Sequence, residues 1–440
     1  MGKMGSTDMA HPAPSPVFRA LGGQMPGDGF SALPTPRNII DEGQLTRNGQ
    51  ILSSEDGFSS LPTPCYIIDE GQLIRNGQIL SSVMSRTGCR ILLAQKAFSN
   101  YQFYPLLAEF LTGTEASGLY EARLGAEEMP GREVHVFCAA YREDEFEELL
   151  TYADHIVFNS PRQLKKFGPR AREAGKSLGL RINPQCSTQE GHGIYDPCAP
   201  GSRLGTTRAV WDAEMDRAAV SLLDGLHFHT LCEQGADALA LTAEAVEKTF
   251  GDVLPQMKWL NMGGGHHITK DGYDIPLLEC TIRHMTERYG VQVYLEPGEA
   301  VALNAGFLAC RVLDIVTNSG IQTAILDVSA ACHMPDVLEM PYTPPLYGAE
   351  SGEGEPGDGF TYRLAGPTCL SGDVIGTYRF PAPLEEGDLL LFGDMAIYTT
   401  CKNNTFNGMP LPDIWKRDRQ GRLERLVTFG YGDFKCRLGR

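Results

Sequence analysis

A regular alternation of short apolar runs with amphipathic stretches, from Arg90 to about Gly306, limits the possible folds of this chain more than any other feature. Apolar runs of about four to eight residues are typical of buried parallel strands, and the stretches between them have helical spacing. So many consecutive strand–helix units predict a closed (β/α)8 TIM barrel, which we place at residues 86–305. The predicted strands are RILLAQ, EVHVFCA, HIVFN, LGLRIN, GLHFHT, WLNMGG and VQVYLEPG, and the clearest helices are EDEFEELLTYA and GADALALTAEAVEKTF.

The pattern changes after residue 305, where strand-like runs follow one another with turns between them. This predicts a second domain, an antiparallel β-barrel or sandwich, and the fold class is therefore α/β plus β. We assign residues 306–440 to this domain, together with residues 58–85, whose strand is expected to join the same sheet. Its predicted strands include AGFLACRVLDIVTN, QTAILDVSA, DVIGTYRF and GDLLLFGD.

The residues before the barrel contain an internal repeat. The segment Phe30–Ser54 returns as Phe58–Ser82, an offset of 58 − 30 = 28 residues, and only four paired positions differ. Two copies are too few for a solenoid, so only one can occupy a single place in the fold. We choose the second, because its PCYIID is a better strand than PRNIID and leads into the first barrel strand. Residues 1–57 are then expected to be a disordered tail.

Composition narrows the class of function. The net charge of −17 argues against nucleic acid or an anionic membrane as a partner, whereas it suits a cationic small molecule. No apolar run approaches the roughly 18 residues of a membrane span, and no secretory signal is visible. The 12 cysteines are scattered singly, which favours reduced thiols and a cytoplasmic location.

Several predicted strands end in residues that can do chemistry, and function in such a barrel collects at these ends. Lys96 ends the first strand. It either reaches to water there or, partly buried, serves as a nucleophile that binds a carbonyl cofactor covalently. Gly263, Gly264 and Gly265 follow another strand and form either a turn or a cradle whose amides hold a phosphate.

Two histidines, His227 and His229, are separated by one residue on the strand GLHFHT, and we expect only one of them to face the barrel mouth. Either is a satisfied core histidine, or one packs its face on an aromatic ring. A metal site is the alternative, but no helical or finger-type ligand spacing supports it, and we predict none. Its further ligands would be Cys232, Glu233, His266 and His267.

Glu296 follows the last predicted strand of the barrel. A carboxylate there is costly unless it is paired, and a protonated pyridine nitrogen is a suitable partner. Together, the nucleophilic lysine, the glycine cradle, the stacking imidazole and this carboxylate describe a site for pyridoxal phosphate. The β domain adds PTCLSGD, with Cys369 and Asp373, and DMAIYTTCKNNTFNG, with Tyr398, although both motifs also have ordinary structural interpretations.

The sequence resembles the alanine-racemase-type (fold type III) pyridoxal-phosphate decarboxylases in six motifs: AQKAF, FHTLCE, GGGHH, EPGEA, GPTCLSGD and DMAIYT…FNG. The resemblance covers Leu61–Arg440. GPTCLSGD is shared with ornithine, arginine and diaminopimelate decarboxylases. HTLCE and EPGEA are more similar to the branch that decarboxylates carboxynorspermidine and carboxyspermidine in polyamine biosynthesis, which implies norspermidine or spermidine as the product.

This resemblance implies a role for each matching residue. Lys96 would bind the cofactor and act in catalysis, and Cys369 would return a proton after carbon dioxide leaves. The remaining cofactor contacts would be His229 on the ring, Gly263, Gly264, Gly265 and Tyr398 at the phosphate, and Glu296 at the pyridine nitrogen. The family is homodimeric, which implies that Cys369 and Asp373 reach into the active site of the partner subunit.

One departure from the family pattern bears on the substrate. Diaminopimelate and ornithine decarboxylases usually have EPGR, whereas Glu299 here takes the place of the arginine. A carboxylate near the substrate favours a cationic ligand. Further acidic candidates for the substrate amines are Glu233, Asp336, Glu339 and Asp373. Another basic amino-acid decarboxylase of the same fold, or a pyridoxal-phosphate-binding protein without turnover, is the alternative.

Overall fold

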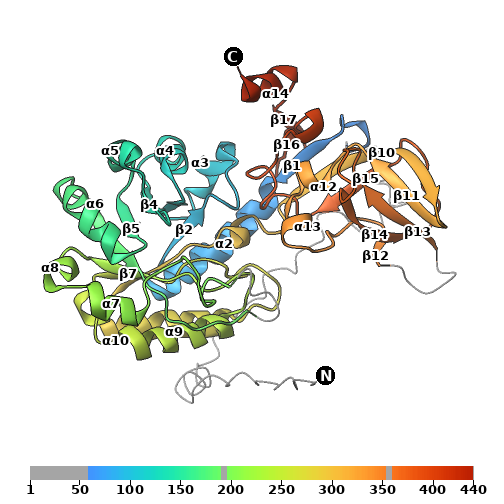
Figure 1. The fold of residues 1–440 in the computed structure, drawn as a ribbon. Helices are drawn as coiled ribbons and strands as arrows, with labels where there is room; N and C mark the ends of the chain where they lie inside the picture. The colour runs from blue at the N-terminus through green and yellow to red at the C-terminus, as the bar shows by residue number, and fades with distance from the viewer. Residues whose placement is uncertain (1–57, 190–195, 353–358, 440) are drawn as a thin grey trace, which may run out of the picture.

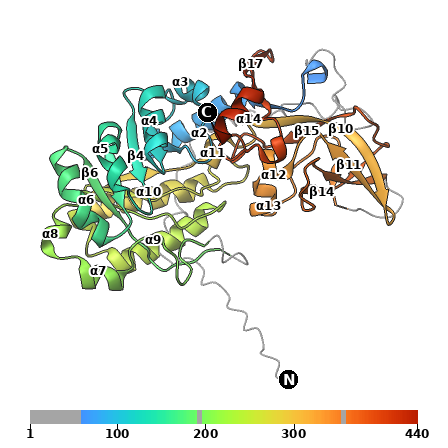
Figure 2. The same ribbon diagram turned by 45° about the horizontal axis from the view of Figure 1, so that its top comes forward.

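The computed structural model describes residues 58–189, 196–352 and 359–439, and two domains lie side by side in it (Figures 1 and 2). Eight parallel strands close into the predicted barrel, so their carboxyl ends all face one mouth. Seven of the eight were predicted. The barrel strands are β2 (Arg90–Ala94), β3 (Gly113–Ala116), β4 (Glu133–Phe137), β5 (His155–Phe158), β6 (Ser177–Arg181), β7 (Gly225–His227), β8 (Trp259–Asn261) and β9 (Gln292–Leu295).

The strand missing from the prediction is β3. Its four residues are Gly, Thr, Glu and Ala, without the β-branched or aromatic run that marks a strand. All four are buried, and β3 pairs with β2 and β4. The first residue must be glycine, since a Cβ on Gly113 would lie 1.9 Å from the carbonyl oxygen of Glu133 on the next strand.

Helices cover the outside of the barrel, and the two clearest predictions are confirmed as α5 and α9. Side-chain caps explain where some helices begin: Asp69 accepts a hydrogen bond from the Gln72 amide at 2.6 Å, at the start of α2. The helices of the barrel are α2 (Glu70–Thr87), α3 (Tyr104–Leu107), α4 (Leu119–Glu128), α5 (Glu143–Tyr152), α6 (Pro161–Glu173), α7 (Arg208–Glu214), α8 (Arg217–Val220), α9 (Ala236–Phe250), α10 (Ile275–Tyr289) and α11 (Glu299–Ala302).

The predicted β domain is present, and its sheet is mixed rather than antiparallel throughout. Two of its eight strand pairings are parallel, β1 with β16 and β11 with β13. The order is β12-β14-β13-β11-β10-β1-β16-β17, with β15 paired on β10. Its elements are β1 (Cys65–Asp69), β10 (Gly306–Asn318), β11 (Ile321–Leu326), α12 (Ala330–His333), α13 (Asp336–Glu339), β12 (Glu350–Ser351), β13 (Phe360–Ala365), β14 (Val374–Phe380), β15 (Leu389–Gly393), β16 (Asp413–Arg417), β17 (Leu423–Val427) and α14 (Tyr431–Leu438).

The second copy of the repeat takes part in the fold. It supplies β1, which lies between β10 and β16, and most of α2, which packs against α10 and α11. Residues 58–85 were predicted to belong to the β domain, and the structure divides them between the two domains (Figure 1). The first copy and the predicted tail, residues 1–57, lie outside the described residues.

Residues 394–407, which we name the crossing segment, run from the sheet domain to the barrel mouth. The Tyr398 amide donates to the carbonyl of Ala97 at 2.9 Å, and the Cys401 thiol donates to the carbonyl of Lys96 at 3.0 Å. The crossing segment therefore holds the turn that carries Lys96.

Within the described ranges, no helix is both long and apolar enough to cross a lipid bilayer.

Candidate active site

Lys96 lies in the turn after β2, partly buried at the barrel mouth. Besides the two backbone contacts above, the Thr400 hydroxyl donates to the Asn100 side chain at 2.7 Å, so the crossing segment fixes this turn at three points. Among the described residues, no hydrogen bond or ion pair engages the Lys96 ammonium. A partly buried amine without a partner is suited to covalent binding of a carbonyl group.

His227 and His229 converge with Glu296 inside the barrel, and the nitrogen and oxygen atoms of the three lie within 4.8 Å of one another. We expected only one of these histidines to face the barrel mouth because one residue separates them. That reason was wrong, because residues two apart on a strand lie on the same face. They differ in depth instead. His227 ends β7 and is 1% exposed, whereas His229 follows the strand and is partly exposed at the mouth.

The ring of His229 is fixed by the glycine loop. Its Nδ1 accepts a hydrogen bond from the Gly264 amide at 3.2 Å, which leaves the ring proton on Nε2. Burial, and after it the charge of Lys96, lowers the pKa of His229 well below its ordinary value. The imidazole is therefore neutral, and a neutral ring held by the backbone is suited to packing on a planar cofactor.

The loop Gly263–Gly265 packs tightly on its neighbours. A Cβ on Gly264 or Gly265 would lie 2.3 or 2.1 Å from a backbone carbonyl oxygen, and Gly263 and Gly265 have φ of +71° and +81°. Two of the three amides already donate within the protein, that of Gly263 to Asn261 Oδ1 at 2.9 Å and that of Gly264 to His229. The phosphate cradle stays a prediction, and the loop also serves to orient His229.

Glu296 follows β9 and is 3% exposed. Its carboxylate accepts a hydrogen bond from Asn261 Nδ2, and its second oxygen lies 3.1 Å from His227 Nε2. Burial would raise the pKa of Glu296, but His227 and then Lys96 outweigh it and hold that pKa below its usual range. A buried carboxylate that stays charged can pair with a protonated ring nitrogen.

A second buried carboxylate, Glu115, was missed because its strand, β3, was missed. It is 2% exposed, and its Oε2 has no hydrogen-bond partner among the described residues. Burial raises the pKa of Glu115 more than the nearby Lys96 lowers it, and Glu296 adds to the rise. The site therefore holds two carboxylates whose pKa values are pushed in opposite directions, an arrangement that enzymes use to separate acid and base roles.

Tyr398 comes to the mouth on the crossing segment, with φ of 49° in the left-handed region. It is partly buried, and burial followed by the charge of Glu299 raises the pKa of its phenol. The hydroxyl therefore stays protonated and available as a donor. Its contact with a phosphate stays a prediction.

Two of the predicted substrate carboxylates lie together at the mouth. His267 Nε2 lies 2.9 Å from Glu299 Oε1, and Glu233 lies within 4.8 Å of both. No hydrogen bond or ion pair within the described ranges engages Glu233, and its φ of 54° is left-handed. Partial burial, then the charge of Glu299, raises the pKa of Glu233. Glu233 and the second oxygen of Glu299 thus remain open to a cationic ligand.

Two further acidic candidates, Asp336 and Glu339, lie on α13 and both accept hydrogen bonds from Lys402 of the crossing segment. Lys402 was not singled out in the sequence, where it follows the Tyr398 motif as an ordinary surface residue.

Cys369 lies on the exposed loop between β13 and β14, in the sheet domain. Its amide donates to Asn407 Oδ1 at 2.7 Å, and no hydrogen bond in the described parts of the chain joins this loop to the barrel. Asp373, at the end of the loop, is only 2% exposed and accepts hydrogen bonds from Ser329 and Thr368. Within one chain, Asp373 therefore fixes the base of the loop that presents the thiol.

The histidines considered as metal ligands fall into separate groups: His227 and His229 lie with Glu296, and His267 lies with Glu233 and Glu299. His266 Nε2 lies 3.0 Å from the Gly263 carbonyl, so it is engaged by the backbone. A separate cluster, Glu133, His135 and His155, lies on β4 and β5. Its carboxylate is already bonded to Arg90 and to Tyr294, which indicates a structural network.

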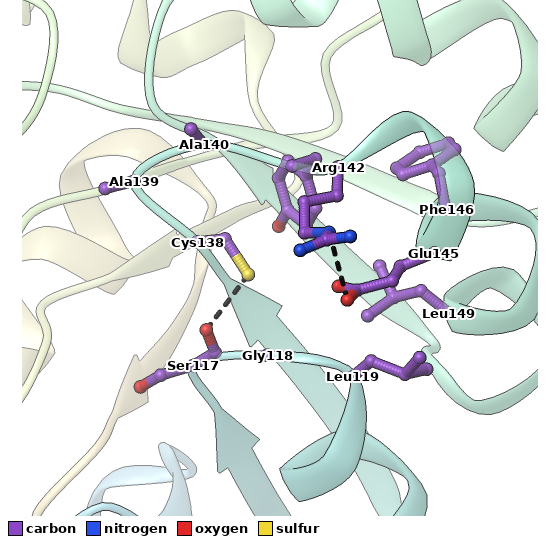
Figure 3. A pocket seen from close by; sticks show the side chains of 11 residues that line it. Ser117, Gly118, Leu119, Cys138, Ala139, Ala140, Arg142, Glu145, Phe146 and Leu149 are labelled. Carbon is purple, nitrogen blue, oxygen red and sulfur yellow. Dashed lines mark hydrogen bonds and ion pairs between the residues drawn. The ribbon is translucent and has the colours of Figure 1, made fainter.

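A surface pocket of about 260 Å³ opens where β3 and β4 end and α4 and α5 begin (Figure 3). Its lining is largely apolar, with one ion pair, Arg142 with Glu145, and the Cys138 thiol bonded to the carbonyl of Ser117. None of the predicted site residues lines it. The chemistry therefore belongs to the group around Lys96 and not to this pocket.

The arrangement fits pyridoxal phosphate on three observations of the structure. The Lys96 amine is partly buried and has no partner among the described residues, the neutral His229 ring is fixed by the glycine loop, and Glu296 is a buried carboxylate kept charged. These groups suit an aldehyde, an aromatic ring face and a protonated ring nitrogen, respectively.

Several known proteins are similar to this chain in sequence and in fold. The family described as pyridoxal-dependent decarboxylase, C-terminal sheet domain, matches residues 65–396. The chain is 40% identical to a carboxynorspermidine/carboxyspermidine decarboxylase of Campylobacter jejuni, over 93% of this chain and 99% of that protein. It is 42% identical to a carboxyaminopropylagmatine decarboxylase of Synechocystis, over 79% of this chain and 88% of that protein. A crystal structure of carboxynorspermidine decarboxylase from Campylobacter jejuni, complexed with norspermidine, has a TM-score of 0.78 at 40% identity and covers 86% of this chain and 100% of that one.

Proposed function

This chain belongs to the pyridoxal-dependent decarboxylase family, and from that premise we propose that it converts carboxynorspermidine to norspermidine, carboxyspermidine to spermidine, or both, in polyamine biosynthesis. One observation of the structure carries the proposal: Glu233, which has no hydrogen-bond or ion-pair partner among the described residues, lies together with Glu299, which contacts His267 through one oxygen only. A carboxylated triamine has two basic nitrogens besides the reacting α-amine, and two carboxylates are the matching partners.

The residues around the cofactor have distinct tasks. Bound pyridoxal phosphate supplies an electron sink for the bond that breaks at the α-carbon. Lys96 would hold the cofactor through its partly buried amine. Glu296 would keep a proton on the ring nitrogen, and His229 would pack on the ring face. Cys369 would donate the proton that replaces the departing carboxylate.

We propose that Cys369 acts across a homodimer. The exposed loop that carries it makes no hydrogen bond to its own barrel within the described residues, so its own chain does not bring the thiol to Lys96. Large apolar side chains are exposed on this loop and on the barrel rim, with Leu370 43% and Tyr120 85% exposed. Apolar exposure of this kind favours a contact between copies. Mixing inactive K96A and C369A subunits should restore activity if the sites are shared.

The decisive test is an assay of purified protein with carboxynorspermidine and carboxyspermidine, in which mass spectrometry identifies the amine product. We expect norspermidine and spermidine, respectively. Hydride reduction before peptide mapping should place the mass of the cofactor on the peptide that contains Lys96. Turnover of diaminopimelate or ornithine alone would contradict the proposal.

A second candidate substrate, carboxyaminopropylagmatine, is favoured by the 42% identical relative from Synechocystis. Its guanidinium end would pair with the same carboxylates, because a guanidinium and a carboxylate form two parallel hydrogen bonds. Adding this compound to the assay, in direct competition, ranks the two substrates by kcat/KM. We also propose a cytoplasmic location, supported by 12 unpaired cysteines.

A further inference from the structure

The last helix of the chain, α14, has an apolar face that the described residues of its own chain leave uncovered. The helix stands away from the rest of the sheet domain (Figure 1). None of its residues is buried, and Tyr431 and Leu438 are 74% and 70% exposed. These two and Phe434 follow one another at intervals of three and four residues, so they lie on one side of the helix. We name these three residues the α14 stripe. An exposed apolar stripe of this kind indicates a contact with another surface.

The α14 stripe lies beside the loop that carries Cys369. A Cβ on Gly408 would lie 4.0 Å from the ring of Phe434, so this ring lies against the residue that follows the crossing segment. The neighbouring Asn407 accepts the hydrogen bond from the Cys369 amide at 2.7 Å. Leu370, next to Cys369, is itself 43% exposed. The thiol loop and α14 therefore meet at one place, and a surface that receives the thiol also meets the helix.

The barrel mouth offers a matching apolar surface next to Lys96. The pocket of about 260 Å³ opens where β3 and β4 end, and β3 is the neighbour of β2, the strand before Lys96. Leu119, Phe146 and Leu149 line the pocket (Figure 3), and Tyr120, in the adjoining hollow, is 85% exposed. Neighbouring strands of a sheet lie about 4.8 Å apart. A body that brings a thiol to Lys96 therefore also reaches this pocket.

The two surfaces have opposite charges. Within the described ranges no ion pair engages Lys435 or Arg437 of α14, and with Asp433 they give the helix a net charge of 2 − 1 = +1. Helices α4 and α5 hold eight acidic residues, whereas four cations lie on them or pair with them, which leaves 4 − 8 = −4. The whole chain has a net charge of −17, so a basic helix on it is complementary to a second copy.

We propose that α14 is a docking helix between two copies of this chain: the α14 stripe of one copy binds the pocket between α4 and α5 of the other, and Lys435 and Arg437 face the acidic residues there. A two-fold axis makes this contact twice, once in each direction. The contact holds the Cys369 loop of each copy at the mouth of the other. The inference rests on the proposed function for the shared site, whereas the docking itself needs neither cofactor nor substrate.

The test measures the dimer dissociation constant of the full-length holoenzyme by analytical ultracentrifugation. Y431D/L438D changes the α14 stripe and Y120D changes the rim of the pocket, and each should raise this constant at least 100-fold. The matched control is I321D, because Ile321 is 45% exposed and begins β11, on the side of the sheet domain away from the barrel (Figure 1). I321D should stay within threefold of wild type. All four side chains are exposed, so the variants should keep the wild-type circular dichroism spectrum.

Hydrogen exchange identifies what covers the α14 stripe. If a second copy covers it, protection of the α14 amides rises with protein concentration in wild type and is absent in Y120D. Protection that does not depend on concentration would mean that the chain covers its own helix, and this would overturn the inference. A dissociation constant within threefold of wild type in both Y431D/L438D and Y120D would also overturn it.

The proposed function is checked separately by the wild-type assay on carboxynorspermidine. If wild type forms no norspermidine but the variants dissociate as expected, the function fails and the docking stands. If wild type is active and Y431D/L438D remains as dimeric as wild type, only the inference fails. If both hold, the activity of Y431D/L438D per subunit should be low in dilute solution and recover as its concentration is raised.

Discussion

Replacing Glu296 by glutamine isolates the charge of the buried carboxylate, because the two side chains have the same shape. The carboxylate now meets two groups, Asn261 Nδ2 and His227 Nε2, with one oxygen each. Glutamine keeps one acceptor and turns an amide donor toward the other group, so at least one charged hydrogen bond is lost. Such a bond contributes about 1.5–3 kcal/mol, and an unpaired buried donor costs about 1–3 kcal/mol more.

Glutamine would also lose the charged hydrogen bond that we propose between Glu296 and the ring nitrogen, and a loss of about 3 kcal/mol there predicts that E296Q lowers kcat/KM about 100-fold, since each 1.36 kcal/mol is tenfold. The matched control is E279Q, which removes a buried carboxylate paired with Arg86 and Arg283 on the outside of the barrel. E279Q should lower the Tm and leave kcat unchanged. An E296Q enzyme within threefold of wild type in kcat/KM would refute the assignment of Glu296 to the ring nitrogen.

The same variant has a pH signature. The folded-state pKa of Glu296 lies below that of the unfolded chain, about 4.3, so its charge stabilises the fold above that pH. This contribution is lost as the pH falls toward the lower folded-state value. The Tm difference between wild type and E296Q should therefore be largest near neutral pH and shrink below about pH 4. A difference that stays constant with pH would show that charge is not its cause.

Three further predictions follow from the site. K96A should release no carbon dioxide and fix no cofactor on hydride reduction; release at the wild-type rate would end the proposed function. H267Q removes the imidazole that contacts Glu299, which costs about 1 kcal/mol of hydrogen bonding. We therefore expect the KM for the triamine substrate to rise about five- to tenfold while kcat stays unchanged. An equal fall in kcat would argue against a binding role for Glu299. Because partial burial and Glu299 raise the pKa of Glu233, the KM should rise on acidification at a higher pH than an ordinary glutamate would give, and E233Q should flatten this profile.

Strand chemistry explains what the sequence could and could not reveal. Seven barrel strands have apolar runs and were found, whereas β3 reads GTEA and was not. Spacing was no reliable guide: β2 and β4 begin 133 − 90 = 43 residues apart with β3 between them, whereas β6 and β7 begin 225 − 177 = 48 residues apart and are neighbours in the barrel.

Some site residues could also be predicted from the sequence, whereas others could not. Lys96, His229 and Glu296 stand in motifs at strand ends, so pattern and topology together bring them to one mouth. No pattern links Lys402 to Asp336, because the two lie 66 residues apart and meet only in the folded domain. The burial of Asp373 could not be predicted from the sequence either, because an aspartate that fixes a turn and an aspartate that binds a ligand can stand in the same loop motif.

The crossing segment links the sheet domain to the residues at the barrel mouth. It bonds to the Lys96 turn through Cys401, to α13 through Lys402 and to the loop of Cys369 through Asn407. One segment therefore holds the Lys96 turn, the acidic helix α13 and the Cys369 loop in place. Of the seven non-glycine residues with positive φ in the described parts of the chain, the segment contains three, Asp394, Tyr398 and Asn407. Backbone strain of about 1–3 kcal/mol per residue persists only where surrounding contacts over-determine it. Relaxing this segment would therefore move all three groups at once.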